Sequence, residues 1–456
     1  MNAAYNSFIA AKRHSSDGNG FAPTFAPGWL FDFQSALVEW SVRRGRAAIF
    51  ADCGLGKTPI ELVWSQNIVE HSNKPVLILA PLAVVAQTVR EGEKFGVTAH
   101  RSSGGTHDRA EIVVTNFEKL HLFNSADFAG VVIDESSILK NFDGSTRTAI
   151  NEFLRNMPYR LLCTATAAPN DHIELGTSSE AVGELGYMDM LSTFFKNDEG
   201  SISPMAYESK FRFKAHAEQP FWRWMCSWAR ALRKPSDLGF DDARFVLPRL
   251  MENIVTVAAS RPMDGFLFPM PARDLNEQRK ERRATIQQRC ETVAELAPSD
   301  RPFVAWCHLN DEADLLERLI PNAIQVSGRD SDESKEEKFE AFRLGQAQLV
   351  TKAQIAAFGL NWQHCADMSA FPSHSFEQYY QQIRRCWRFG QERDVTVHVV
   401  TTEGEADVLG NLKRKAADAD RMFESMVREM HAAQQRSAPA VTLHKPNIPN
   451  WLTPCA

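Results

Sequence analysis

The sequence lacks any apolar run long enough to cross a membrane. Spanning a bilayer takes roughly 20 consecutive apolar residues, and no stretch of the chain approaches that length. The first residues include Lys12 and Arg13 but have neither an apolar core behind them nor a small-residue cleavage pattern, so they do not indicate a secretory signal. We therefore expect a soluble cytoplasmic protein with no membrane partner.

Paired cysteines and a basic excess are also missing. The eight cysteines lie singly, without a CxxC pair or a Cys/His cluster at zinc spacing, which predicts reduced thiols and no structural metal. The net charge is −6, whereas a protein that coats DNA normally carries a basic excess. Any contact with nucleic acid must therefore be local.

The chain is long enough for more than one hydrophobic core. Its 456 residues exceed what a single core usually fills, which predicts two domains. Short apolar runs typical of buried parallel strands recur in two series, and each run is followed by a turn and a helical pattern. The first series is 47–50, 76–79, 112–114, 131–133 and 161–163, and the second is 303–306, 324–326, 348–351, 367–370 and 395–400.

The two series predict the domain organisation. We expect an α/β lobe over 26–175 and a second α/β lobe over 291–430, each a parallel sheet covered by helices. Between them, 176–290 is expected to form a short and mostly helical inter-lobe region. A loose N-terminal arm, 1–25, and a Pro-rich flexible tail, 431–456, complete the chain.

One segment has the pattern of a triphosphate-binding loop. Residues 51–58 read ADCGLGKT and lie between a predicted strand and a predicted helix. Gly54 and Gly56 let backbone N–H groups turn toward phosphate oxygens, and the helix N-terminus adds partial positive charge. Lys57 is placed to reach the β and γ phosphates, and Thr58 to hold Mg²⁺. The first position is alanine where the general pattern has glycine.

A second segment supplies carboxylates for the same site. Asp134 and Glu135 come directly after the apolar run 131–133. Asp134 is placed to hold Mg²⁺, and Glu135 to accept a proton from the attacking water or to orient it. An Asp-Glu pair after a strand is common by itself, but together with Lys57 in the same lobe it predicts the second half of an ATP site.

The second series contains basic side chains at helical spacing. Gln381, Arg385 and Arg388 fall at i, i+4 and i+7, so they share one face of a helix. We interpret Arg385 and Arg388 as arginine fingers for a γ-phosphate held by the other lobe. Such groups accelerate hydrolysis by roughly 10³ to 10⁵ and distinguish a two-lobed motor from a kinase or a switch-type GTPase. The alternative is a solvated basic helix.

From about residue 29 to 425 the chain resembles superfamily 2 helicases, and within them the Swi/Snf-type ATPases. ADCGLGKT and VIDESSILKN resemble the phosphate and magnesium motifs, RLLCTATAAPND the coupling motif, and ILAPLAVVAQ and VVTNFEKL the DNA-contacting segments. VAWCHLNDEADLLERLI, TKAQIAAFGLNWQ and QQIRRCWRFGQ resemble the second-lobe motifs in their order. The wording of the last two is similar to compact helicases of bacteriophages and prophages, which implies the cytoplasm of a bacterial host. The resemblance implies two tandem RecA-like lobes.

The resemblance also implies roles for further residues. Gln34, Gly359 and Gln381 would bind the nucleotide, and Thr164 and Thr166 would couple the ATP site to nucleic acid. The implied nucleic-acid contacts are Pro81, Thr115, Asn116, Lys352 and Asn361, whose types suit sequence-tolerant contact with backbone phosphates. Each of these five is also an ordinary turn or capping residue. Trp306, Trp362 and Trp387 are candidates for base stacking, although buried packing is the preferred interpretation.

Three features depart from the family pattern. Ser136 and Ser137 replace the Ala-His that commonly follows the Asp-Glu pair, and Arg384 stands where the last motif usually has glycine. The inter-lobe region is also short for a chromatin remodeller, which argues against work on nucleosomes.

The sequence thus predicts an ATP- and Mg²⁺-dependent DNA helicase or translocase. One alternative is a DNA-stimulated ATPase that remodels or clamps duplex DNA without separating its strands, and another is an RNA helicase. No second catalytic constellation, such as a nuclease, stands out in the sequence.

Overall fold

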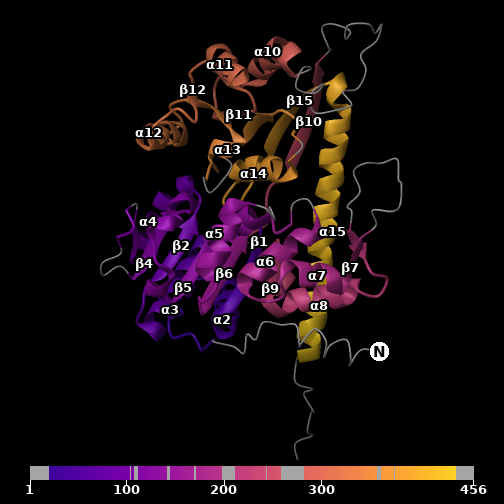
Figure 1. Ribbon diagram of the computed structural model, residues 1–456. Helices are drawn as coiled ribbons and strands as arrows, with labels where there is room; N and C mark the ends of the chain where they lie inside the picture. Colours follow the sequence, from indigo (N-terminus) through magenta and orange to yellow (C-terminus); the bar gives the residue numbers. More distant parts are fainter. Residues whose placement is uncertain are drawn as a thin grey trace, which may run out of the picture.

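Two α/β lobes lie one above the other in the computed structural model (Figure 1). The structure describes residues 20–102, 104–106, 111–140, 144–168, 171–197, 211–242, 244–257, 282–356, 361–373 and 375–437. The first lobe contains both predicted halves of the ATP site. The second contains the helix 376–386, which includes Gln381 and Arg385 but ends at Cys386, so the expectation that Arg388 shares a helical face with them is wrong.

The first lobe is built on a seven-stranded parallel sheet in the order β3-β4-β2-β5-β6-β1-β9. The strands are β1 (Arg46–Ala51), β2 (Val76–Ala80), β3 (Ala99–Arg101), β4 (Ile112–Asn116), β5 (Gly130–Asp134), β6 (Tyr159–Thr164) and β9 (Ala229–Leu232). One face is covered by α2 (Asp32–Arg44), α3 (Lys57–Ser72) and α4 (Leu82–Phe95), and the other by α5 (Ser145–Leu154), α6 (Leu175–Val182), α7 (Tyr187–Phe194) and α8 (Glu218–Trp228). Because helices cover both faces, β2, β4, β5 and β6 are buried along their whole lengths.

The second lobe has a six-stranded parallel sheet in the order β10-β15-β14-β11-β13-β12. Its strands are β10 (Leu250–Val257), β11 (Phe303–Cys307), β12 (Ala323–Val326), β13 (Gln348–Lys352), β14 (Asp367–Ala370) and β15 (Val395–Thr402). Helices α10 (Ile286–Leu296) and α11 (Asn310–Leu319) pack on one face, and α12 (Asp332–Arg343), α13 (Ala353–Ala356) and α14 (Phe376–Cys386) on the other. The predicted α/β class, with parallel sheets covered by helices, is confirmed in both lobes.

The structure divides the expected inter-lobe region, 176–290, between the two sheets. Its first part contributes α7, α8 and the edge strand β9 to the first lobe, whereas β10 pairs with β15 in the second. Burial explains the difference, because the aromatic side chains of α8, such as Phe221 and Trp228, complete the first-lobe core. A short antiparallel ribbon, β7 (Phe195–Asn197) with β8 (Phe211–Phe213), lies beside them.

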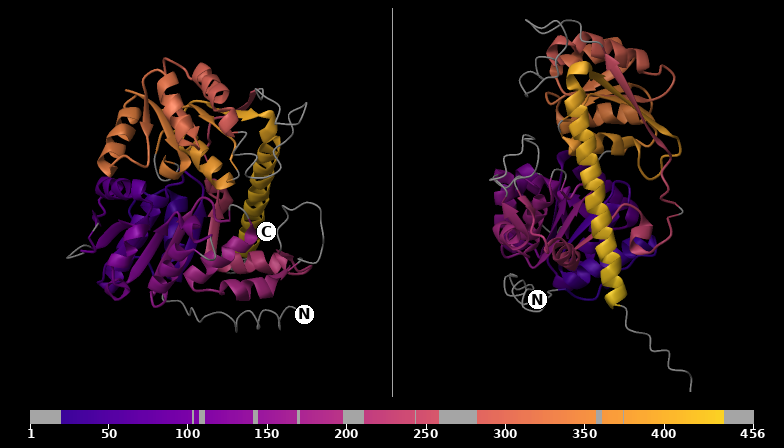
Figure 2. Two further views of the ribbon diagram at one scale, coloured as in Figure 1. Left: turned by 45° about the horizontal axis from the view of Figure 1, so that its top comes forward. Right: turned by 90° about the vertical axis from the view of Figure 1, so that its right-hand side faces the viewer.

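The last described helix, α15 (Ala406–Ser437), runs from the second lobe along the side of the first (Figure 2). Leu412 packs in the second-lobe core, whereas Met422, Phe423, Met426 and Met430 join the core of the first lobe. The helix therefore ties the two lobes together and continues past residue 431, where the tail was expected to begin. Within the described ranges, no helix is both long enough and apolar enough to cross a membrane.

Part of the expected N-terminal arm is fixed against the first lobe. The ring of Phe21 stacks on His71 at 3.7 Å between centroids, and the Asn67 side chain accepts the N–H of Thr24 at 2.8 Å. The arm therefore packs on α3 from residue 20 onward, and residues 1–19 lie outside the described residues.

We predict that the C-terminal half of α15 stabilises the first lobe. Phe423→Ala should lower the free energy of unfolding by about 3–5 kcal/mol, because it leaves a cavity among buried side chains, while Glu424→Ala, at the adjacent exposed position, should change it by about 0.5 kcal/mol or less. Thermal or urea unfolding of the full chain measures both. Equal effects of the two substitutions would contradict the packing described here.

Candidate active site between the lobes

Three neighbouring strands of the first sheet bring the predicted catalytic residues together. The strands β5, β6 and β1 lie side by side, and parallel strands end at the same edge of a sheet, where ligands of such folds bind. The loop 51–58 follows β1, Asp134 and Glu135 end β5, and Thr164 ends β6. The first-lobe half of the predicted ATP site is therefore one continuous surface.

The two glycines of the loop are needed for its shape. Gly54 and Gly56 have φ values of 90° and 75°, which side-chain-bearing residues rarely adopt. A Cβ on Gly54 would lie 2.7 Å from the backbone nitrogen of Phe389 in the second lobe. A Cβ on Gly56 would lie 2.3 Å from Nε2 of Gln34. The lack of a side chain at these two positions therefore permits the turn of the loop and the close approach of Phe389 to Gly54 and of Gln34 to Gly56.

Gln34 is buried beneath this loop. Its Nε2 donates to the carbonyl of Leu55 at 2.9 Å, and its Oε1 accepts the N–H of Phe31 at 3.1 Å. The side chain that the sequence assigns to nucleotide binding thus lies in direct contact with the phosphate loop. Thr58 is the second residue of α3, beside Lys57.

Lys57 and the carboxylates of β5 form a concentrated charge cluster. Lys57 Nζ donates to the carbonyl of Ala51 at 3.2 Å. Burial lowers the pKa of Lys57, but the nearby negative charges, those of Glu135 and Asp134 among them, outweigh burial and raise it. Burial and the charge of Glu135 raise the pKa of Asp134 to about 7. The cluster therefore contains more buried carboxyl groups than the single positive charge of Lys57 would neutralise.

Glu61 adds a third buried carboxyl group behind this cluster. It lies on α3 one turn after Lys57 and is fully buried. Burial, with the charge of Asp134, raises its pKa well above the ordinary value. Nothing in the sequence distinguishes Glu61, because its helix position resembles any other within an apolar segment.

A chain of polar contacts leads from Glu135 to the second lobe. Thr164 Oγ1 donates to Glu135 Oε2 at 3.4 Å and accepts the N–H of Thr166 at 3.1 Å. Thr166 Oγ1 donates to Oε1 of Glu377, on α14, at 3.4 Å, and Lys140 pairs with the same carboxylate. The two threonines assigned to coupling thus lie between the predicted catalytic acid and the second lobe.

The two predicted arginine fingers differ in their contacts: Arg388 lies beside Gly54 of the first lobe, and Arg385 is buried against Gln381 of its own helix. Arg385 is 2% exposed, and its Nη2 donates to Oε1 of the buried Gln381 at 2.8 Å. Arg388 is half-buried, and its Cβ would lie 3.4 Å from a Cβ on Gly54. Burial, with the charge of Arg385, lowers the pKa of Arg388 to about 10. This burial argues against the alternative of a solvated basic helix.

Arg384, which departs from the family pattern, has a defined partner. Its guanidinium forms an ion pair with Asp52 of the phosphate loop, and the hydroxyl of Tyr380 donates to the same carboxylate. The sequence does not predict roles for Asp52, Tyr380, Lys140 and Glu377. Arg384 stands out as a departure from the family pattern, but its partner Asp52 is 332 positions away and cannot be identified from the sequence.

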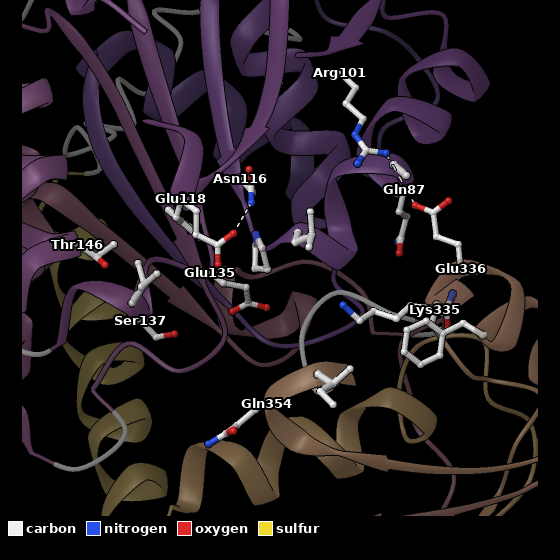
Figure 3. Close-up of a pocket in the computed structure, with 18 of the residues that line it drawn as sticks. Gln87, Arg101, Asn116, Glu118, Glu135, Ser137, Thr146, Lys335, Glu336 and Gln354 are labelled. Carbon is white, nitrogen blue, oxygen red and sulfur yellow. Dashed lines mark hydrogen bonds and ion pairs between the residues drawn. The ribbon is translucent and has the colours of Figure 1, made fainter. Parts of the chain in front are cut away.

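A cleft of about 1660 Å³ opens next to Glu135 and is lined by both lobes. Figure 3 shows Asn116, Glu118 and Glu135 on its first-lobe side and Gln354 on its second-lobe side. Pro81 and Asn361 also line it. Three of the five predicted nucleic-acid contacts, Pro81, Asn116 and Asn361, therefore lie in one cleft.

The structure places the other two nucleic-acid candidates differently. Thr115 is 1% exposed, and its hydroxyl donates to the carbonyl of Ser102 at 2.8 Å, so the hydroxyl is directed into the first lobe. Lys352 Nζ donates to Oδ1 of Asn310 at 2.5 Å and is not part of the cleft lining. Gly359 lies outside the described residues.

The cleft carries both signs of charge. Its basic side chains are Arg90, Lys94, Arg101, Lys140, Lys335 and Arg343, and its acidic ones are Glu118, Glu135, Glu336, Glu337, Glu340 and Glu377. Trp306 and Trp362 are buried at 1% and 2% exposure, and Trp387 donates its Nε1–H to the carbonyl of Pro248 at 2.7 Å. Trp306 and Trp362 are thus part of the second-lobe core and Trp387 packs against that core, while Trp362 also lines the cleft.

The structure thus combines two α/β lobes, with the predicted phosphate loop in the first and α14 of the second packed against it. No protein-family model matches the chain.

Two known proteins are similar to the chain over most of its length. It is 23% identical over 465 residues to the uncharacterized ATP-dependent helicase YqhH of Bacillus subtilis (strain 168), a match that covers 90% of this chain and 81% of that protein. Its structure is similar to S. cerevisiae Dbp5 bound to RNA and ADP BeF3, with a TM-score of 0.54 and 12% sequence identity, over 88% of this chain and 98% of that chain. The predicted tandem RecA-like fold and the resemblance to helicases are confirmed at this level.

We predict that Gly54 is required for contact between the lobes. Gly54→Ala introduces a Cβ both at a positive φ and 2.7 Å from the Phe389 nitrogen, so it should reduce binding of a fluorescent ATP analogue by about tenfold or more. Gly96→Ala is the matched control, because Gly96 has a similar φ of 71° and open space around it. That change should cost about 1 kcal/mol of stability and leave nucleotide binding intact. Equal nucleotide affinities for the two variants would contradict the close approach.

Proposed function

We propose that the chain is a DNA-dependent ATPase that uses ATP and Mg²⁺ to move along DNA. The observation that carries the proposal is the position of the phosphate loop, covered by α14 of the other lobe, with Arg388 beside Gly54. A nucleotide at this loop would contact both lobes, so its hydrolysis and release would change how the lobes meet. The similarity to a protein named as an ATP-dependent helicase supports the same conclusion.

The residues present fit a magnesium-bound triphosphate. Burial and the charge of Glu135 raise the pKa of Asp134 to about 7, so these crowded carboxyl groups resist ionising together. A bound cation would offset that repulsion and stabilise the ionised forms. Thr58 and Asp134 would hold Mg²⁺, which would supply neutralising charge for the phosphates. Among the described residues, no group of three or more His, Cys, Asp or Glu side chains is arranged to hold a metal ion by itself. Mg²⁺ in such sites needs only one or two carboxylates beside substrate phosphates and water.

Each side chain then has a specific role. Lys57 binds the β and γ phosphates, and Glu135 orients the attacking water or accepts its proton. Arg385 and Arg388 stabilise the charge that develops on the γ-phosphate. Gln34 fixes the phosphate loop from beneath, through its bond to the Leu55 carbonyl.

Nucleic acid would occupy the cleft that begins at Glu135. Pro81, Asn116 and Asn361 line it, and the contacts through Thr164 and Thr166 reach from Glu135 to the second lobe. The mixed charge of the lining suits a few local phosphate contacts and explains how a protein of net charge −6 would bind a polyanion.

DNA is the substrate that the Swi/Snf-type wording of the motifs favours, and a bacteriophage or prophage origin would be consistent with it. RNA is the second candidate, because the similar fold of Dbp5 was solved bound to RNA. The same ATP site between the lobes is compatible with separation of DNA strands and with movement along DNA without separation.

We predict that DNA stimulates ATP hydrolysis more than RNA does. Phosphate release should be measured without nucleic acid and with single strand, duplex and RNA. Lys57→Ala or Arg388→Ala should lower turnover by about 10³ or more, whereas the exposed control Lys74→Ala should not. A rate indifferent to every nucleic acid, or wild-type turnover by Lys57→Ala, would refute the proposal. Displacement of a strand from a forked duplex then separates a helicase from a translocase or a clamp.

We predict that Mg²⁺ binding weakens as the pH falls below about 7. The pKa of Asp134 is about 7 because burial and the charge of Glu135 favour its protonated form, and the metal requires the carboxylate. The apparent Mg²⁺ affinity in nucleotide binding should therefore fall by about tenfold per pH unit below the pKa. Titrations of Mg²⁺ at pH 6, 7 and 8 test this. Asp134→Asn should bind weakly at every pH, and a pH-independent wild-type affinity would contradict the assignment.

A further inference from the structure

The carboxylate of Asp52 is shared between the phosphate loop and the second lobe. Its Oδ1 accepts the N–H of Cys53, the next residue in the loop, at 2.6 Å. The same oxygen accepts Nε–H of Arg384 at 3.2 Å and the hydroxyl of Tyr380, and Oδ2 pairs with Arg384 Nη2. One acidic side chain thus shapes the loop and binds two residues of α14.

Arg384 is held in place on every side. The guanidinium is 4.8 Å from the ring centroid of Trp387 and 5.5 Å from that of Tyr380, and Nη1 donates to the Trp387 carbonyl at 3.2 Å. The Arg384 and Asp52 side chains are only 3% and 8% exposed. Both charges are therefore removed from water and depend on each other.

The position of this pair relates it to the predicted chemistry. Arg384 directly precedes Arg385 near the end of α14, and Arg388 follows just after the helix, on the segment that meets the loop. Asp52 lies two residues before Gly54, which approaches Phe389 of the same segment. Because Asp52 and Arg384 come from opposite lobes, loss of either one would leave the other charge buried and unpaired in the closed arrangement, which is costly. The intact pair therefore permits a closure that either charge alone would oppose.

We propose that Asp52 and Arg384, assisted by Tyr380, are a positioning pair that closes the second lobe on the phosphate loop and sets Arg388 against it. The inference rests on the proposed ATPase function for its effect on turnover, but closure itself is a property of the protein without nucleotide. Arg384 acts through the position of its neighbours and has no assigned contact with the reacting phosphate.

Small-angle X-ray scattering of the full chain without nucleotide tests closure directly. Arg384→Gln and the isosteric Asp52→Asn should each give a larger radius of gyration than the wild type, because the lobes separate when the pair is lost. Arg384→Lys, which keeps the charge, should lie between. Arg318→Gln is the control, because Arg318 is exposed and donates only to Asp314 of its own helix. Circular dichroism confirms that each variant is folded, and Asp52→Asn tests the pair from the other lobe if Arg384→Gln does not fold.

Steady-state hydrolysis then tests positioning. The kcat of Arg384→Gln should fall by about tenfold or more, while the Kd for fluorescent ADP changes less, because Lys57 and the loop remain. Tyr380→Phe, which removes one hydroxyl, should lower kcat by only about threefold. A wild-type radius of gyration in both Arg384→Gln and Asp52→Asn would overturn the pair even if the protein hydrolyses ATP. An expanded variant together with a wild-type protein that lacks ATPase activity would instead uphold the pair and refute the proposed function.

Discussion

The contact between the phosphate loop and α14 is the constraint on which the rest of the structure depends. Gly54 has no side chain, so the backbone around Phe389 approaches the loop directly. Asp52 and Arg384 bring opposite charges together at the same contact. A small residue and a buried ion pair act together here. Close packing leaves no room for a side chain at Gly54, and a buried charge at Asp52 or Arg384 would be costly without its partner.

This contact gives the two lobes a shared interface rather than two separate surfaces. On one side of it lie Lys57 and Asp134, and on the other Arg385 and Arg388. From Glu135, hydrogen bonds through Thr164 and Thr166 reach Glu377 on the same helix. The helix α14 therefore contacts both the predicted phosphate loop, through Arg384, and Thr166, one of the two threonines predicted to couple that loop to nucleic acid. In the proposed function, movement of this helix would connect a change at the phosphates to the cleft.

Much of the fold was predictable because buried parallel strands have continuous apolar sequences. The strands β2, β5 and β11 are uninterrupted apolar runs in the sequence. The predicted phosphate loop is recognisable from its own residues alone. In the two large sheets, β3, β9 and β10 were not predicted. All three lie at sheet edges, and β3 and β9 are only 3 and 4 residues long. The segment of β10 is partly exposed and polar, so its place beside β15 depends on pairing and not on its own composition. The role of α15 in both cores is likewise a tertiary property.

In the candidate site, too, local motifs are predictable from the sequence and contacts between the lobes are not. The sequence predicts roles for Lys57, Asp134 and the arginines, since each lies in a motif that is recognisable from its own residues. It does not reveal that Arg384 pairs with Asp52 or Thr166 with Glu377, because those contacts join opposite lobes. The motif position of Thr115 likewise does not reveal that its hydroxyl turns inward to Ser102.

The central claim is that one nucleotide is held by both lobes at once. A crystal structure of the full chain with Mg²⁺, ADP and beryllium fluoride tests it most directly, because the fluoride complex occupies the place of the γ-phosphate. The account predicts that Lys57 contacts this group from the first lobe while Arg385 or Arg388 contacts it from the second. A nucleotide bound to the loop 51–58 with both arginines out of hydrogen-bond reach would contradict it.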